Sequence, residues 1–212
     1  MKIGAVYLAA GSSKRMGEAK LPLELAPGIT VGSRALLELR HCGLHRIVVV
    51  VRPDDPMLWL YDRKERHGVL PKYRIVPCRD ANDGMSRSIQ RGLLATMADG
   101  SDAVLIAHAD QPFVSASLLR RLIAVYRENP SVDYVACGYG GTVGLPVIFG
   151  SSMFPALREL QGDSGVMRLL QSSDSRGKVI RHAAEWSFID IDTKEQLEKA
   201  RLIWSTLHLK AK

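Results

Sequence analysis

The sequence IGAVYLAAGSSKRMGEAK, residues 3–20, decides the fold because an apolar run in it leads directly into a loop of glycine, serine and basic residues. The run over residues 3–8 shows no alternation of apolar and polar residues, and residues 47–51 and 103–107 repeat this pattern. Strands without alternation are typical of parallel sheets that are buried on both faces. Helices must then cover both faces, so the sequence predicts an α/β fold with a doubly wound, mostly parallel, Rossmann-like sheet.

Helical periodicity separates these strands. Two stripes of apolar residues recur at the spacing of an α-helix. They comprise Leu118, Leu119, Leu122, Ile123 and Tyr126 in one segment, and Ile89, Leu93, Leu94 and Met97 in the other. Ser33 and Ser115 are the expected N-caps, and Gly43 and Gly100 are the expected helix stops.

Three further strands are expected over residues 133–137, 145–149 and 179–182. A last helix is expected after Thr193, because Thr193 and Gln196 have the spacing of a capping box. The order of elements therefore extends the α/β pattern to the end of the sequence.

Size and composition favour one cytoplasmic domain over residues 1–212, with 46% apolar and 24% charged residues. The longest apolar stretches, such as residues 47–51, are far shorter than the roughly 20 residues of a membrane span. The net charge of +7 comes without the aromatic motifs of RNA-binding domains, so neither a nucleic acid nor a membrane is expected as a partner. Cys42, Cys78 and Cys137 are widely spaced, which fits a reducing compartment and no structural zinc site.

The loop after the first strand has the composition of a phosphate-binding loop. In an open α/β sheet the ligand crevice lies beyond the carboxyl ends of the strands, where this loop is expected. Backbone N–H groups of such a loop can approach phosphate oxygens, and basic side chains neutralise them. The candidate donors are Gly11, Ser12, Ser13 and Gly17, and the candidate cations are Lys14, Arg15 and Lys20. The spacing matches neither a Walker A loop nor GxGxxG, and a basic surface turn is the alternative interpretation.

Four motifs carry a resemblance to a known family. They are LAAGxSxRMGxxK at residues 8–20, GMSxSIxxG at 84–92, DQP at 110–112 and DIDT at 190–193. In this order they resemble the MobA/MocA-like nucleotidyltransferases, which join a nucleoside monophosphate to the terminal phosphate of molybdopterin cofactors. The resemblance spans nearly the whole chain, and the first loop is its most specific part.

The resemblance implies a role for each motif. Arg15 and Lys20 would contact a nucleoside triphosphate, and Asp110 would anchor Mg²⁺, a hard cation that prefers oxygen ligands. The implied nucleotide-binding residues are Leu8, Ala9, Ala10, Gly11, Ser12, Ser13, Lys20, Gly84, Ser86 and Ser88. Asp190 or Asp192 would complete the metal site, and Gly162, Asp163 and Gly165 would contact the acceptor.

Several of these residues also have a structural interpretation. Asp110 could be an ordinary turn residue before a proline, and Ser86 and Ser88 could simply begin a helix. Asp192 could be an N-cap residue with a reciprocal Glu195. His108 is interpreted as a hydrogen-bonded loop residue and not as a base or ligand.

The identity of the substrates depends on departures from the family pattern. Members that use CTP tend to carry LAAG and those that use GTP tend to carry LAGG, so Ala10 favours CTP. Cys78, Ala81 and the GLP segment at residues 144–146 depart from the residues of relatives, which puts the pterin contacts in doubt. The alternatives are a guanylyltransferase, a sugar- or polyol-phosphate cytidylyltransferase, and a non-catalytic carrier that delivers the molybdenum cofactor to a molybdenum hydroxylase client.

Overall fold

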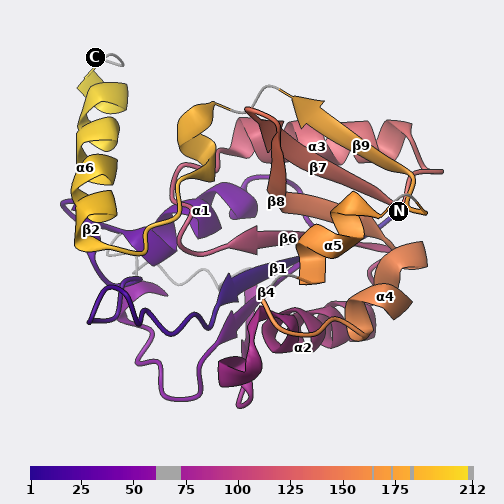
Figure 1. Cartoon of the computed structure of the whole chain (residues 1–212), viewed down its shortest axis with the longest axis horizontal. Coiled ribbons are helices and arrows are strands. Elements are labelled where there is room, and N and C mark those ends of the chain that lie inside the picture. Colours follow the sequence, from indigo (N-terminus) through magenta and orange to yellow (C-terminus); the bar gives the residue numbers. More distant parts are fainter. Residues whose placement is uncertain (61–72, 164, 173, 182–183, 210–212) are drawn as a thin grey trace.

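A seven-stranded sheet runs through the centre of the molecule, and helices pack on both of its faces (Figure 1). The computed structural model describes residues 1–60, 73–163, 165–172, 174–181 and 184–209. The strands, in their order across the sheet, are β5 (Tyr73–Pro77), β4 (Arg46–Val51), β1 (Ile3–Ala9), β6 (Ala103–His108), β8 (Thr142–Gly150), β7 (Tyr134–Tyr139) and β9 (Gly177–Arg181). Within this sheet β8 runs antiparallel to both of its neighbours and the other pairs are parallel. The predicted mostly parallel sheet is therefore confirmed.

The helices divide into two layers. One face of the sheet is covered by α1 (Val31–Arg40), α3 (Ala116–Glu128) and α6 (Lys194–Leu209). The other is covered by α2 (Met85–Ala98), α4 (Phe154–Arg158) and α5 (Gly165–Gln171). Short 3₁₀ turns lie at η1 (Leu58–Leu60), η2 (Ala81–Asp83), η3 (Ser151–Met153) and η4 (Glu185–Phe188), and β2 (Glu24–Ala26) pairs with β3 (Ile29–Thr30) in a small ribbon.

Alternate side chains of β1 enter two separate cores. Ala5 and Tyr7 belong to the core under α1 and α3, whereas Val6 and Leu8 belong to the core under α2. Complete burial of a Val or Leu side chain stabilises the fold by about 1.5–3 kcal/mol. Continuous apolar runs are thus explained by burial on both faces, as the sequence predicts.

Helix α2 approaches the sheet closely at Gly92. A Cβ atom at this position would lie 2.4 Å from a methyl carbon of Val6 and 3.0 Å from one of Val50. Glycine in the middle of a helix is normally unfavourable. Here it allows the helix backbone to pack directly against β1 and β4, which sets the position of the amino end of α2.

The order in which the chain adds strands to the sheet reverses next to β1. It passes from β1 to β4 and β5, and it then returns to β6 on the opposite side of β1. The carboxyl ends of β1 and β6 lie side by side, because Leu8 is in register with His108 and the Ala109 N–H donates to the Leu8 carbonyl at 3.0 Å. Ligand crevices of doubly wound sheets form at such a point.

Some local predictions are corrected by the structure. The N-cap of α1 is Thr30 and not Ser33, which occupies the third helical position and completes a reciprocal cap with Thr30. Leu94 is 48% exposed, so it does not belong to the buried stripe of α2. The last predicted strand is β9, and His182 lies outside the described residues.

Other helix boundaries are as expected. The Ser115 side chain accepts the Leu118 N–H and caps α3, and Gly100 follows the end of α2 with a φ of 76°. In the described part of the chain, none of the helices combines the length and the hydropathy of a bilayer span.

Candidate active site

A cavity of about 600 Å³ opens at the carboxyl ends of β1 and β6. This volume lies within the range of small-molecule sites. Among the residues predicted to bind ligands, those that line it are Leu8, Ala9, Ala10, Gly11, Ser12, Ser13, Arg15, Lys20, Gly84, Ser88, Asp110, Asp163, Asp190 and Asp192. Ser86 and Gly162 lie outside this lining, and Gly165 is the first residue of α5.

Hydrogen bonds within the loop after β1 fix its conformation. The Ser13 carbonyl accepts the Met16 N–H at 3.0 Å, and the Ser13 hydroxyl accepts the Lys20 N–H at 3.3 Å. Ser13 has a φ of 50° and Gly17 a φ of 77°, so the loop turns sharply at both positions. Met16 is only 4% exposed and anchors the loop to the core. These contacts fix the path that presents the loop cations to the cavity.

Lys20 is almost completely buried, although it carries a charge. Its side chain is 6% exposed, and Nζ lies 2.5 Å from Asp110 Oδ2 and 2.7 Å from Asp192 Oδ1. Burial alone would lower the pKa of the ammonium, but the negative charges of Asp110 and Asp192 outweigh it and raise the pKa. Lys20 therefore remains protonated at the side of the cavity.

Asp192 links the segment before α6 to the phosphate-binding loop. Its Oδ2 lies 2.6 Å from Nη2 of Arg15, and its backbone N–H donates to Gln196 Oε1 at 2.8 Å. The interpretation of Asp192 as an N-cap paired with Glu195 is wrong. The cap of α6 is Thr193, whose hydroxyl accepts the Gln196 N–H at 3.2 Å while its own N–H donates to Gln196 Oε1 at 3.0 Å.

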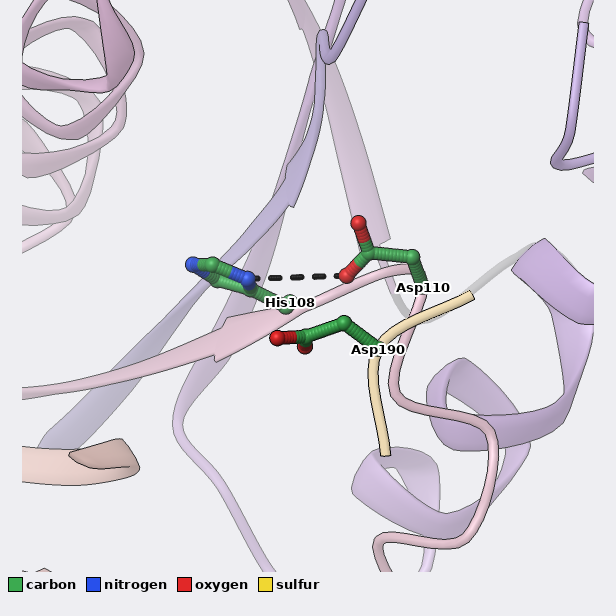
Figure 2. A group of neighbouring side chains, drawn as sticks. All are labelled: His108, Asp110 and Asp190. Atoms are coloured by element: carbon green, nitrogen blue, oxygen red, sulfur yellow. Dashed lines mark ion pairs between the residues drawn. The ribbon is translucent and has the colours of Figure 1, made fainter. Parts of the chain in front are cut away.

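His108, Asp110 and Asp190 converge at the side of the cavity (Figure 2). One ligand atom from each residue lies within 4.8 Å of the others. His108 Nδ1 is 3.5 Å from Asp110 Oδ1. Asp110 Oδ1 and Asp190 Oδ1 are both buried, and neither accepts a hydrogen bond from the described residues. The two carboxylates therefore present buried oxygen acceptors with too few donors.

The charges of this group are strongly coupled. Burial opposes ionisation of Asp110, but nearby His108 and Lys20 hold the pKa of its carboxyl far below the usual range. The pKa of Asp190 is raised, first by burial and then by the charge of Asp110. Burial would lower the pKa of His108, but the Asp110 carboxylate, 3.5 Å from Nδ1, raises it. A positive charge between these residues is thus favoured.

A divalent cation fits these side chains. Two carboxylate oxygens that lack donors are the ligands that Mg²⁺ and Mn²⁺ bind, and an imidazole nitrogen adds a third donor. Asp110 and Asp190, both predicted as metal ligands, belong to this group. Asp192 does not, because its two oxygens face the cations of Lys20 and Arg15.

The predicted nucleotide and acceptor segments meet at the start of α2. Asp163 Oδ1 accepts the Met85 N–H at 2.7 Å, and the Gly162 carbonyl accepts the Ser86 N–H at 3.1 Å. Gly84 has a φ of 116°, and a Cβ atom there would lie 2.8 Å from the Gly162 backbone. Asp163 thus caps α2 as well as lining the cavity, and Ser86 is buried in the helix.

Comparison with known sequences places the chain in a family. The sequence profile of the MobA-like NTP transferase domain matches residues 5–179. This chain belongs to that family. It is 32% identical over 198 residues to the purine catabolism protein PucB of Bacillus subtilis, covering 92% of this chain and 94% of PucB.

Two further relatives of this MobA-like protein are informative. The nicotine blue oxidoreductase of Paenarthrobacter nicotinovorans is 27% identical over 200 residues, covering 92% of this chain and 94% of the relative. The crystal structure of Rv0371c from Mycobacterium tuberculosis in complex with manganese is 24% identical and has a TM-score of 0.72, covering 95% of this chain and 99% of Rv0371c. The likeness to Rv0371c supports the same α/β nucleotidyltransferase-like fold.

The MobA-like site contains two residues that the sequence alone did not indicate. His108 was expected to be a loop residue, but it is the last residue of β6 and faces Asp110 and Asp190. The sequence did contain a signal for this position. Side chains alternate along a strand, so His108 is expected on the same face of β6 as Ile106. Met85 was known only as part of a motif, and its sulfur lies 3.1 Å from His108 Nε2. That contact crosses from α2 to β6 and has no local sequence signature.

Proposed function

We propose that this MobA-like protein transfers CMP from CTP to the terminal phosphate of a molybdopterin-type acceptor and releases pyrophosphate. The observation that carries the proposal is the pairing of the loop cations Lys20 and Arg15 with the carboxylates of Asp110 and Asp192 beside a cavity of about 600 Å³. A triphosphate can take the place of these carboxylates as the partner of both cations.

The proposed reaction needs cations at the triphosphate and no covalent nucleophile. When an acceptor phosphate oxygen attacks the α-phosphorus, the bond to pyrophosphate breaks and negative charge collects on the leaving oxygens. Lys20 and Arg15 would bind these oxygens, and each charge-assisted hydrogen bond contributes about 1.5–3 kcal/mol. Lys20 is already buried and oriented, so little side-chain entropy is lost when it binds.

The divalent cation would be held by Asp110 and Asp190. Their buried Oδ1 atoms lack donors, which supports a metal at this point. Mg²⁺ or Mn²⁺ there would neutralise charge on the triphosphate. Rv0371c, which has the same fold, was crystallised in complex with manganese, and this supports a divalent cation as the cofactor.

The preference for CTP is inferred from Ala10. This residue lines the cavity together with Ala81 and Ser88, and it is 5% exposed. A methyl group at this position narrows the space for a base, which favours a pyrimidine over a purine. One methyl group discriminates by about 1–3 kcal/mol, so the preference is expected to be moderate.

The acceptor is inferred from the family. The MobA-like family, whose resemblance implies a molybdopterin-type acceptor, supports that acceptor and a molybdenum hydroxylase client for this chain. Asp163 lines the cavity and can contact an acceptor through the oxygen that α2 leaves free. Gly162 and Gly165 would act through the backbone near it.

The test is pyrophosphate release with each of the four nucleoside triphosphates, in the presence of Mg²⁺ or Mn²⁺ and of molybdopterin with or without molybdenum. The proposal requires release that depends on the acceptor and is fastest with CTP. Preference for GTP would make the protein a guanylyltransferase, and release with a sugar or polyol phosphate instead would change the acceptor.

Two controls address different kinds of function. Tight binding of the molybdenum cofactor without turnover of any nucleotide would indicate a carrier. One relative bears the name of an oxidoreductase, so reduced nicotinamide dinucleotides are included with the acceptor. Their acceptor-dependent oxidation without pyrophosphate release would contradict the proposal.

A further inference from the structure

Both ring nitrogens of His108 have defined neighbours. Nε2 lies 3.1 Å from the sulfur of Met85, and Nδ1 lies 3.5 Å from Asp110 Oδ1. A thioether sulfur can accept a hydrogen bond but cannot donate one. A hydrogen bond to Met85 therefore requires the proton of a neutral His108 ring to be on Nε2.

In the neutral ring this arrangement places the Nδ1 lone pair beside the two carboxylates, so a bound metal would take the place of the proton that otherwise faces Asp110 across 3.5 Å. Nδ1, Asp110 Oδ1 and Asp190 Oδ1 belong to one group whose ligand atoms lie within 4.8 Å of one another. Both carboxylate atoms are buried and receive no hydrogen bond from the described residues. A positive charge, either a proton or a metal ion, is needed among these atoms, because buried carboxylate oxygens without donors are unfavourable. Figure 2 shows the His108 ring facing the Asp110 carboxylate across their ion pair, with the Asp190 carboxylate next to them.

Metal-binding histidines in proteins share this pattern. The ring nitrogen that does not bind the metal usually donates its proton to a neighbouring acceptor, which fixes the ring orientation. Met85, at the start of α2, supplies that acceptor here. Asp110 Oδ2 is bound to Lys20, so its Oδ1 remains available on the side of His108.

We propose that His108 is a metal ligand through Nδ1 and that it gives the cation site a preference for Mn²⁺ over Mg²⁺. The inference rests on the proposed function, because it concerns the cation that a nucleotidyltransferase of this kind uses. Mg²⁺ prefers an all-oxygen environment and gives up its water reluctantly. Mn²⁺ accepts carboxylates and imidazole together, so a nitrogen donor shifts selectivity toward it. Met85 acts as a positioning residue that holds the tautomer.

The experiment measures binding of the metal alone to the whole chain, without nucleotide or acceptor. Calorimetry gives the affinities for Mn²⁺ and Mg²⁺, and electron spin-echo modulation of bound Mn²⁺ detects a coordinated nitrogen. The variants are His108→Gln, which replaces nitrogen by oxygen, and Met85→Leu, which removes the sulfur acceptor. His41→Gln is the matched control, because His41 is an exposed histidine that hydrogen-bonds only to the Leu37 carbonyl among the interactions described for its side chain.

The expected result is a ¹⁴N signal in the parent and in His41→Gln that is absent in His108→Gln. We expect His108→Gln to lower the ratio of Mn²⁺ to Mg²⁺ affinity by about 10- to 100-fold, and Met85→Leu to lower it by a smaller factor in the same direction. Absence of the nitrogen signal in the parent overturns the proposal, and this measurement needs no variant to fold. An unchanged affinity ratio in a folded His108→Gln protein also overturns it, and makes His108 only an ion-pair partner of Asp110.

Failure of this inference and failure of the proposed function give different results. A nitrogen signal without pyrophosphate release from any nucleotide would uphold His108 as a ligand and contradict the transferase. Release of pyrophosphate from CTP without a nitrogen signal would do the reverse.

Discussion

Replacement of Lys20 by methionine removes the central positive charge of the site and keeps the length of the side chain. The ammonium lies between Asp110 at 2.5 Å and Asp192 at 2.7 Å, and it is 6% exposed. From the sequence, a loop lysine would be expected to bind ligand without affecting the fold. The structure changes this expectation, because the variant leaves Asp110, Asp190 and Asp192 close together without their main counter-charge. Lys20→Met is therefore expected to lower stability as well as triphosphate binding.

The magnitude follows from the burial of the pair. Loss of one partner of a fully buried ion pair costs about 3–5 kcal/mol. Asp110 and Asp192 retain 18% and 21% of their side-chain exposure, so water partly compensates, and about 2 kcal/mol is the expected loss at pH 7. For a chain of this size that loss corresponds to a fall in melting temperature of roughly 4–8 °C.

The pH dependence provides a second check. The low pKa of Asp110 in the folded protein contributes stability that is present above the unfolded-state value near 4 and is lost as the pH falls below it. The difference in stability between parent and Lys20→Met should therefore be largest at neutral pH and decrease below about pH 4. Added Mn²⁺ should also reduce it, since a divalent cation supplies the missing charge.

Melting temperatures of Lys20→Met and of Lys14→Met test this reasoning directly. Lys14 is an exposed lysine of the same loop and controls for loss of one positive charge. Equal melting temperatures of the two variants at pH 7 would refute the buried counter-charge role. So would a difference that persists unchanged to pH 3.

Four further variants have defined outcomes. Asp110→Asn should abolish metal-dependent pyrophosphate release, whereas Asp192→Asn should keep Mn²⁺ affinity and weaken CTP binding. Equal Mn²⁺ affinities of the two variants in calorimetry would contradict the assignment of Asp110 to the metal and of Asp192 to the loop cations. Gly84→Ala should cost about 1–3 kcal/mol in urea unfolding, because the new Cβ would lie 2.8 Å from Gly162 at a φ of 116°. Ala10→Gly should shift the ratio of kcat/KM values toward GTP by about 10- to 200-fold at most, and an equal fall for both nucleotides would make Ala10 a packing residue.

Much of the fold was predictable because it depends on the local pattern of apolar and polar residues. Residues 103–107 are apolar without alternation, and they form a strand buried on both faces. The cap of α6 was also predictable, since Thr193 and Gln196 lie within one turn. The antiparallel direction of β8 was not predictable, because strand direction depends on the connection and not on the residues of the strand.

The parts of the site that sequence could not supply are contacts between distant segments. Lys20 and Asp192 are 172 residues apart, and neither has a local feature that identifies its partner. His108 was mistaken for a loop residue because it follows an apolar run and precedes an aspartate. Only the register of β1 with β6 and the position of α2 bring it between Met85 and Asp110.

We propose that the cavity at the ends of β1 and β6 binds a nucleoside triphosphate and that the protein transfers its nucleoside monophosphate to a pterin phosphate. The most direct test is mass spectrometry of the products formed from CTP, molybdopterin and Mn²⁺, with Lys20→Met as the matched inactive protein. The parent protein should form the cytidine dinucleotide of the pterin and one equivalent of pyrophosphate, and the variant should form neither. Formation of no dinucleotide from CTP or GTP by the folded parent protein would contradict it.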